Sequence, residues 1–262
     1  MYNQYPHLEL PFLEATIPQS KKEVNGICRI LKKYEIGIGA RILDFSCGIG
    51  SHSMELAKKD FKVVGYDPSK FYIEYARTWS KKQDPKTRRN VRFVQGDPLK
   101  LLGSLSIDKK FDAAIVMGAT IGTNSEKFDT LILQNIGKVL NIGSILILEI
   151  ENRDWTVNNF QSHIHHQSES IEVIEEWKFN FESSEAQSVT KFYQKIKHDH
   201  NYLELLLKLK IRLRLYSLHE IIKILRKAGW SYLESYDNID NLTPVKNQSQ
   251  DMIIVATNRI LT

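Results

Sequence analysis

Short apolar runs alternate with amphipathic stretches along residues 1–151. The runs have the length and composition of buried strands, and the stretches between them place apolar side chains three and four positions apart, as helices do. Ser20, with Glu23 three positions later, is the expected N-cap of the first helix. Strands that alternate with helices form a largely parallel sheet covered on both faces. The predicted strands are 41–46, 63–67, 91–97, 111–117 and 144–151, and the predicted helices are 20–35, 51–59, 70–82 and 126–140.

The pattern changes after Asn152, where residues 169–215 contain long alternating stretches. Residues 207–215, LKLKIRLRL, alternate strictly and predict a strand with one apolar and one basic face. The segment KHDHN, 197–201, predicts a turn before it. We therefore expect an antiparallel insertion over 152–216. We expect its basic side chains (Lys208, Lys210 and Arg212, with Arg214 as an exception) to pair across strands with Glu172, Glu175 or Glu176 rather than to face an anionic substrate.

The last segment closes the fold. A helix is predicted over 217–228, ended by Gly229, and strands over 231–236 and 252–257 rejoin the main sheet. The prediction is one α/β domain, 1–262, with a Rossmann-like sheet of seven strands, the last antiparallel. Its parts are a segment 1–19, a core 20–151, the insertion 152–216 and the closing elements 217–262.

Composition limits the class of protein. Hydrophobic residues make up 42% of the 262 residues and charged residues 26%, which is typical of a soluble globular protein. The start, MYNQYPHLELPF, lacks the signal-peptide pattern, and no apolar run approaches the roughly 20 residues of a membrane helix. Two cysteines make no disulfide framework, so we expect a cytoplasmic protein without a membrane partner. The net charge of +5 permits an anionic partner, but nucleic acid is not expected.

Acids and glycines collect where the predicted strands end. The segment DFSCGIG, 44–50, joins an acid to two glycines, which let the backbone approach a ligand, and the helix after it supplies free N–H groups. Asp67 and Asp97 end the next two strands, where carboxylates can accept hydrogen bonds from ribose hydroxyls and from an exocyclic amino group. Open α/β sheets bind ligands at this edge, so we expect a nucleotide-like ligand there.

Together with Met117 to Gly122, these features resemble the cofactor site of class I S-adenosylmethionine-dependent methyltransferases, over roughly Gln19 to Glu151. The resemblance implies a methyltransferase fold, methyltransferase activity and S-adenosylmethionine as cofactor. Three features depart from the family pattern: Ser46 stands where glycine is usual, Ser51 stands where arginine is frequent, and NIGS (141–144) stands where proline-glycine-glycine is usual. The cofactor-binding residues implied are Asp44, Ser46, Gly48, Gly50, Asp67, Pro68, Asp97, Pro98, Met117 and Gly118.

Two later motifs, ENRDWTVNNF after the fifth strand and LRLYSLHEIIKILRKAGW before the last strands, resemble one subgroup of the family. They suggest Arg153, Trp155, Arg214 and Tyr216 as acceptor contacts. The predicted acceptor is a small molecule, methylated at oxygen or nitrogen under a lid made by 1–19 and the insertion. Tyr2, Tyr5 and Phe12 make that N-terminal segment aromatic. Catalytic residues and oligomeric state are not predicted.

Several alternatives stay open. A dinucleotide dehydrogenase would have glycine at position 53, where this chain has Ser53. An RNA or protein acceptor, or a non-catalytic S-adenosylmethionine-binding protein, would use the same cofactor site. The histidines of SHIHHQ (His163, His165 and His166) are expected to lie in a solvated loop. A catalytic base among them is the alternative, and no metal site is expected.

Overall fold

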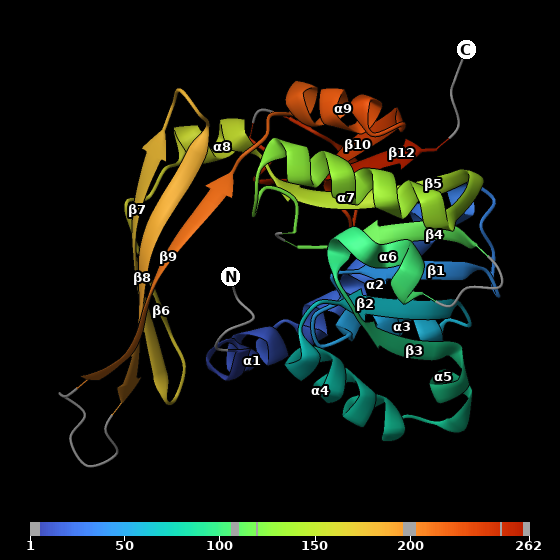
Figure 1. Ribbon diagram of the computed structural model, residues 1–262, viewed down its shortest axis with the longest axis horizontal. Helices are drawn as coiled ribbons and strands as arrows, with labels where there is room; N and C mark the ends of the chain where they lie inside the picture. Colours follow the sequence, from blue (N-terminus) through green and yellow to red (C-terminus); the bar gives the residue numbers. More distant parts are fainter. Residues whose placement is uncertain (1–5, 106–109, 119, 196–202, 247, 259–262) are drawn as a thin grey trace.

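The central sheet determines where most predicted site residues lie. The computed structural model describes residues 6–105, 110–118, 120–195, 203–246 and 248–258. In these, eight strands form one sheet in the order β11-β10-β12-β5-β4-β1-β2-β3 (Figure 1). β1 to β5 are parallel, and β12 runs antiparallel to both of its neighbours. The strands are β1 (Arg41–Phe45), β2 (Lys62–Asp67), β3 (Val91–Gln95), β4 (Phe111–Val116), β5 (Leu140–Glu151), β10 (Ser231–Asn238), β11 (Thr243–Pro244) and β12 (Asp251–Thr257).

Two layers of helices bury the two faces of this sheet. Leu43 and Phe45 face α6, α7 and α9, whereas Ile42 faces α2, α3 and α4, as the alternation of a strand requires. In Figure 1, α6 and α7 lie in front of the sheet, with α2 and α3 behind it. The helices are α2 (Ile17–Lys33), α3 (Ser51–Lys58), α4 (Lys70–Lys81), α5 (Pro85–Asn90), α6 (Leu101–Ser104), α7 (Glu126–Val139) and α9 (Leu218–Lys227).

The predicted α/β fold is confirmed, with local differences. All seven predicted strands are present, and the two-residue β11 extends the edge of the sheet beyond them. The prediction that Ser20 is an N-cap is wrong. α2 begins at Ile17, and the Ser20 hydroxyl donates a hydrogen bond to the Ile17 carbonyl within the helix at 2.7 Å. Proline in the first turn, where an N–H has no helical partner, explains the earlier start.

The insertion is a second, antiparallel sheet that stands beside the core in Figure 1. Its strands follow the short helix α8 (Arg153–Asn158) and pair in sequence order. The loop predicted around the histidines is wrong, because those residues form β6. The predicted turn at 197–201 lies outside the described residues. The strands are β6 (His163–Gln167), β7 (Ile171–Asn180), β8 (Glu185–Lys195) and β9 (Leu203–Arg214).

The charge pairing predicted for β9 is wrong in its partners. β8 lies between β7 and β9, so the acids of β7 cannot face β9 directly. Instead, Arg212 pairs with Glu185 of β8. Two β7 acids pair with lysines of β8: Glu176 with Lys191 at 2.7 Å and Glu172 with Lys195 at 3.6 Å. The pairing of opposite charges was expected correctly, but strand order decides which charges meet.

The helix α1 (Pro6–Ala15) connects the insertion sheet to the core. Leu8 packs with Ile171, Val173 and Phe192 in a small apolar cluster on the insertion sheet. On the side of the core, Glu9 accepts a hydrogen bond from the Tyr72 hydroxyl of α4 at 2.6 Å. The segment had no clear apolar period, so its helix was not predicted. α1 lies over the edge of the central sheet where the parallel strands end (Figure 1).

Close packing of α2 yields a stability prediction. A Cβ atom added at Gly26 would lie 1.9 Å from the backbone oxygen of Ile239, which cannot move without its chain. Gly26→Ala should lower the free energy of unfolding by about 1–3 kcal/mol or more, measured by urea denaturation. Gly103→Ala is the matched control, because nothing lies within 4 Å of its added Cβ. Equal stability of the two variants would contradict this packing.

Candidate functional site

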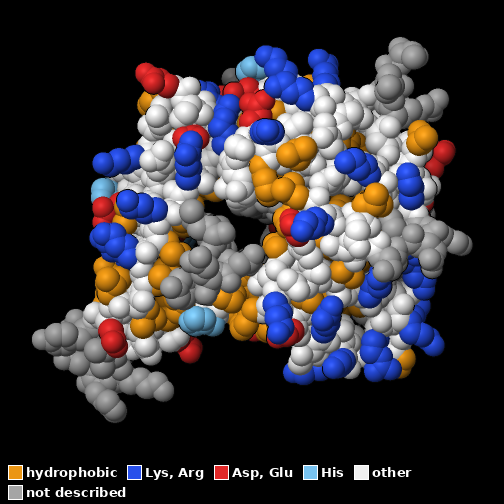
Figure 2. All heavy atoms as spheres, in the orientation of Figure 1, with side chains coloured by type: hydrophobic (Ala, Val, Ile, Leu, Met, Phe, Trp, Pro, Cys, Tyr) orange, Lys and Arg blue, Asp and Glu red, His pale blue; other side chains and the backbone are white. Residues whose placement is uncertain are grey.

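A cavity of about 1020 Å³ lies where the edge of the central sheet meets α1 and the insertion sheet. Figure 2 shows the molecule hollowed between these two parts. Asp44, Gly50 and Asp97 are not among the described residues that line it. The other predicted cofactor residues all line it, and these are Ser46, Gly48, Asp67, Pro68, Pro98, Met117 and Gly118.

The turn between β1 and α3 has a left-handed backbone at several positions. φ is +60° at Ser46, +52° at Gly48 and +84° at Gly50. A Cβ at Gly48 would meet nothing within 4 Å and would occupy cavity space, whereas a Cβ at Gly50 would lie 2.6 Å from the Phe93 ring. Gly48 therefore keeps the cavity floor open for a ligand, and Gly50 lets α3 pack on the sheet. Such a floor fits a nucleoside cofactor.

Asp67 lies at the end of β2 and holds this turn in place. One carboxylate oxygen accepts a hydrogen bond from the Gly48 N–H at 3.0 Å, and the other accepts one from the Ser69 N–H at 2.8 Å. Burial raises the pKa of Asp67 to about 6, although both backbone bonds oppose the shift. Each carboxylate oxygen has a second lone pair, so Asp67 can still accept hydroxyl donors from the cavity.

Asp44 is buried beneath the turn. It accepts a hydrogen bond from the Ser53 hydroxyl at 2.6 Å, and burial raises the pKa of its carboxyl group. Next to it, the His52 Nε2 lies 2.7 Å from a Glu23 oxygen, and this partner raises the pKa of His52 against the effect of burial. Asp44 thus fixes the start of α3 from below. Ser53, at the position where a dehydrogenase would have glycine, supplies its partner.

The ends of β3 and β4 complete the sheet edge. Asp97 caps the short turn Pro98–Lys100 by accepting from the Leu99 N–H at 2.9 Å, and Pro98 lies on the cavity wall. Beyond β4, the Gly118 N–H donates to a Glu149 oxygen at 2.8 Å. Gly118 has a φ of +75°, and a Cβ there would meet nothing within 4 Å. The sequence had placed Asp97 itself on the adenine side, and that role stays a prediction.

The four residues predicted as acceptor contacts are placed beside the cavity rather than on its described lining. Arg153 donates to the Ser184 hydroxyl at 3.0 Å, and Trp155 lies in α8. The Arg214 guanidinium lies 4.7 Å from the centre of the Tyr216 ring. Arg214 also pairs with Glu220 at 2.6 Å. Whether any of the four contacts an acceptor stays a prediction.

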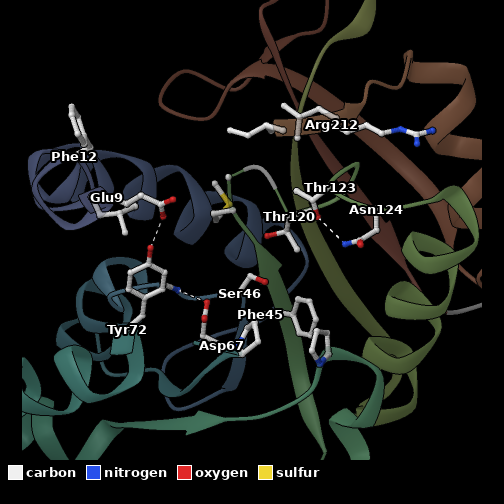
Figure 3. Close-up of a pocket in the computed structure, with 18 of the residues that line it drawn as sticks. Glu9, Phe12, Phe45, Ser46, Asp67, Tyr72, Thr120, Thr123, Asn124 and Arg212 are labelled. Carbon is white, nitrogen blue, oxygen red and sulfur yellow. Dashed lines mark hydrogen bonds between the residues drawn. The ribbon is translucent and has the colours of Figure 1, made fainter. Parts of the chain in front are cut away.

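Tyr216 and Arg214 position a loop that does line the cavity. The buried Tyr216 hydroxyl donates to Asp129 at 2.7 Å, and the same Asp129 oxygen accepts from the Gly122 N–H at 3.0 Å. The Gly122 carbonyl in turn accepts from the Arg214 N–H at 2.7 Å. This network fixes the segment between β4 and α7, from which Thr120, Thr123 and Asn124 face the cavity (Figure 3).

Several cavity residues had no role in the sequence prediction. Glu9 lies in a segment without periodicity, and Tyr72 belongs to a helix whose apolar positions indicated only packing. The signal for Tyr72 was its place in the first turn of the helix after Asp67. The insertion sheet also contributes His166, Val173, Glu175, Phe192, Ile211, Arg212 and Leu213.

The buried Tyr216–Asp129 bond yields a second prediction. Tyr216→Phe leaves a buried carboxylate without its hydroxyl donor, so the free energy of unfolding should fall by about 1–3 kcal/mol in chemical denaturation. Tyr232→Phe is the control, because it removes a hydroxyl that pairs only with Ser235 in a part-buried position. A Tyr216→Phe variant that kept its stability but lost acceptor affinity would favour the direct role that the sequence suggested.

Comparisons with known proteins agree with this geometry. A family model described as "Methyltransferase domain" matches residues 36–229, more than half of the chain. The putative methyltransferase YqeM of Bacillus subtilis is 28% identical over 113 residues, which are 43% of this chain and 42% of YqeM. The chain therefore spans less than half of the length of this curated relative.

Two solved structures have the same fold. A S-adenosylmethionine-dependent methyltransferase from Clostridium acetobutylicum superposes with a TM-score of 0.74 at 16% identity, over 98% of each chain. The S-adenosylmethionine-bound amino pentose methyltransferase CalS10 from Micromonospora echinaspora superposes with a TM-score of 0.65 at 15% identity, over 91% of each chain. With the family match, the chain belongs to the methyltransferase-domain family, and its fold is that of solved S-adenosylmethionine-dependent methyltransferases.

Proposed function

We propose that the protein transfers the methyl group of S-adenosylmethionine to an oxygen or nitrogen atom of a small molecule. One observation supports this most strongly. A single cavity is lined both by the residues expected to hold the cofactor and by side chains of α1 and the insertion sheet. A cofactor on the sheet edge would therefore share one cavity with its acceptor. Alignment of two reactants in such a space accounts for much of the catalysis of a displacement reaction.

The cofactor contacts follow from the cavity floor. When bound, S-adenosylmethionine supplies a methyl group on a sulfonium leaving group. Asp67 would accept hydrogen bonds from its ribose hydroxyls, and Gly48 would let its chain lie close to the turn. Pro68 and Pro98 border the side where the adenine would lie, with Asp97 adjacent. Met117 and Gly118 would face the methionine part, beside the buried Asp44.

A small acceptor suits the other half of the cavity. α1 and the insertion sheet cover it with apolar side chains, which exclude water from the transfer. The segment 1–19 and the insertion would act as the lid. The structure describes residues 6–19, 152–195 and 203–216 of these two segments. The amino pentose named for CalS10 is an acceptor of comparable kind. An RNA or protein acceptor is the second candidate, supported only by the net charge of +5.

The cellular location is also a proposal. Both cysteines, Cys28 and Cys47, are free thiols, which agrees with a reducing compartment such as the cytoplasm. No helix in the described ranges has the length and hydropathy needed to cross a bilayer.

A methyl-label assay tests the proposed function. Protein with labelled S-adenosylmethionine is incubated separately with small metabolites, total RNA and total protein from cells. Label should enter the small-molecule fraction and yield S-adenosylhomocysteine. Label in RNA or protein alone would reverse the acceptor class. Cofactor binding without any turnover in the three fractions would favour a non-catalytic binding protein.

The raised pKa of Asp67 yields a pH prediction. The ionised carboxylate accepts ribose hydroxyls and the protonated form does so poorly, so cofactor affinity should fall as the pH is lowered from 7 to 5, through the pKa of about 6. Asp67→Asn should weaken binding by about 1–3 kcal/mol at pH 7.5 and flatten this pH dependence, measured by calorimetry with S-adenosylhomocysteine. Asp97→Asn is the comparison variant, because it changes the other predicted cofactor carboxylate, which is not on the described cavity lining. Wild-type affinity that does not change over this range would remove Asp67 from the cofactor site.

A further inference from the structure

The carboxylate of Glu9 lies beside the cofactor edge, next to the first turn of α4. It comes from α1, and its oxygen accepts from the Tyr72 hydroxyl at 2.6 Å. In Figure 3, the two groups point toward each other above Asp67 and Ser46, on the same side of the cavity as the glycine turn. One hydroxyl donor uses only part of the acceptor capacity of a carboxylate, so Glu9 can receive a further donor from the cavity.

The charges of the acceptor half are mainly negative. Glu9 and Glu175 both line it, and Glu175 accepts from the Trp177 indole N–H at 2.5 Å. Arg212 contributes its aliphatic stem, but its guanidinium pairs with Glu185 and points away from Glu9 in Figure 3. His166 is the other basic residue of the described lining.

The remaining wall is apolar. Phe12 and Leu13 of α1 oppose aliphatic and aromatic side chains from the central strands of the insertion. A ligand that matched this half would place a cationic group at the carboxylates and an apolar body against the insertion sheet, because a buried carboxylate is best compensated by a paired donor. The insertion side chains concerned are Val173, Phe192, Ile211 and Leu213.

We infer that the acceptor is an amine with an apolar body, and that Glu9, oriented by Tyr72, binds its nitrogen and removes its proton before methyl transfer. This inference rests on the proposed function and names its substrate class. A protonated amine has no lone pair, so a base near the transferring methyl group is required. Glu9 is the carboxylate of the described lining that comes from α1, lies beside the cofactor edge and is held by a hydroxyl donor.

The reaction balances as follows. The ammonium group R–NH₃⁺ gives one proton to the Glu9 carboxylate and becomes R–NH₂. The nitrogen lone pair then forms the bond to the methyl carbon, and the carbon–sulfur bond breaks with its electron pair on sulfur. The products are R–NH₂–CH₃⁺ and S-adenosylhomocysteine, and Glu9 releases its proton to solvent.

The protonation behaviour of Glu9 suits this role. Burial raises its pKa to about 7, and the hydrogen bond from Tyr72 opposes the rise. A carboxyl group with such a pKa exchanges protons readily near neutral pH. The other titratable groups on the cavity wall are Asp67 of β2, His166 of β6 and Glu175 of β7, together with Tyr72 itself. An inflection in the pH profile of turnover can therefore be assigned to Glu9 only by comparing wild type with the Glu9 and Tyr72 variants.

A second glutamate–tyrosine pair supplies a matched control. Glu14, also on α1, accepts from the Tyr75 hydroxyl of α4 at 2.7 Å, but this pair is exposed and is not part of the described cavity lining. Glu14→Gln thus removes the charge from a similar contact between the same two helices without changing the cavity. A general effect of loosening α1 would appear in both variants, whereas a role in acceptor binding would appear only in Glu9→Gln.

The first test measures binding to protein loaded with S-adenosylhomocysteine. Calorimetry at pH 8 compares hexylamine with hexanol, which share an apolar chain. Wild type and Glu14→Gln should prefer the amine by about tenfold or more, as expected for a charge-assisted hydrogen bond. Glu9→Gln should lose that preference and keep its affinity for hexanol and S-adenosylhomocysteine.

The second test measures turnover with labelled S-adenosylmethionine and a panel of primary amines. Glu9→Gln should lower kcat by about 100-fold, the usual contribution of a general base. Tyr72→Phe should move the acid limb of the pH profile to higher pH, because the hydrogen bond that lowers the Glu9 pKa is lost.

The outcomes separate the two proposals. An amine that binds no better than the alcohol, including the case in which neither binds, would overturn the inference while S-adenosylhomocysteine binding leaves the proposed function intact. A protein that binds no S-adenosylhomocysteine would overturn the proposed function itself. Equal effects of Glu9→Gln and Glu14→Gln would reduce Glu9 to a helix contact.

Discussion

The carboxylate of Asp67 joins the two strand ends on which the site depends. It accepts the Gly48 N–H from the turn after β1 and the Ser69 N–H from the start of α4. The parallel pairing of β1 with β2 already sets Phe45 opposite Tyr66, so the carboxylate needs only to bridge the last residues of each strand. Because Asp67 is buried, both bonds offset the cost of removing its charge from water. Bonds within the chain therefore shape the edge of the sheet that borders the cavity.

The same bridge explains how the turn tolerates Ser46. A residue with a side chain costs about 1–2 kcal/mol in the left-handed region, and the family usually has glycine there. The strain persists because the neighbouring positions are fixed by Asp67 on one side and by the packing of Gly50 against Phe93 on the other. Ser46 thus keeps a left-handed backbone at a position where the family usually has glycine.

The part of the cavity that α1 and the insertion sheet cover depends on contacts between distant parts of the chain. α1 packs its Leu8 on the insertion sheet and its Glu9 on Tyr72, so it covers the cavity from one side. On another side, Tyr216 and Asp129 hold the loop that follows β4. The motif that suggested acceptor contacts thereby has a structural use that the sequence did not indicate. Both sets of contacts therefore determine the position of the cavity wall.

The sequence by itself determined the seven longer strands of the central sheet, the helices α2, α3, α4, α7 and α9, and the glycine turn that follows β1. Those features depend on local periodicity and on turn chemistry, which adjacent residues such as those of 44–50 carry. Only the tertiary structure decided that β8 separates β7 from β9 and that Arg212 meets Glu185. It alone brought Glu9 to Tyr72, 63 positions apart. No local pattern encodes such contacts, because they arise from how whole elements pack after each has formed.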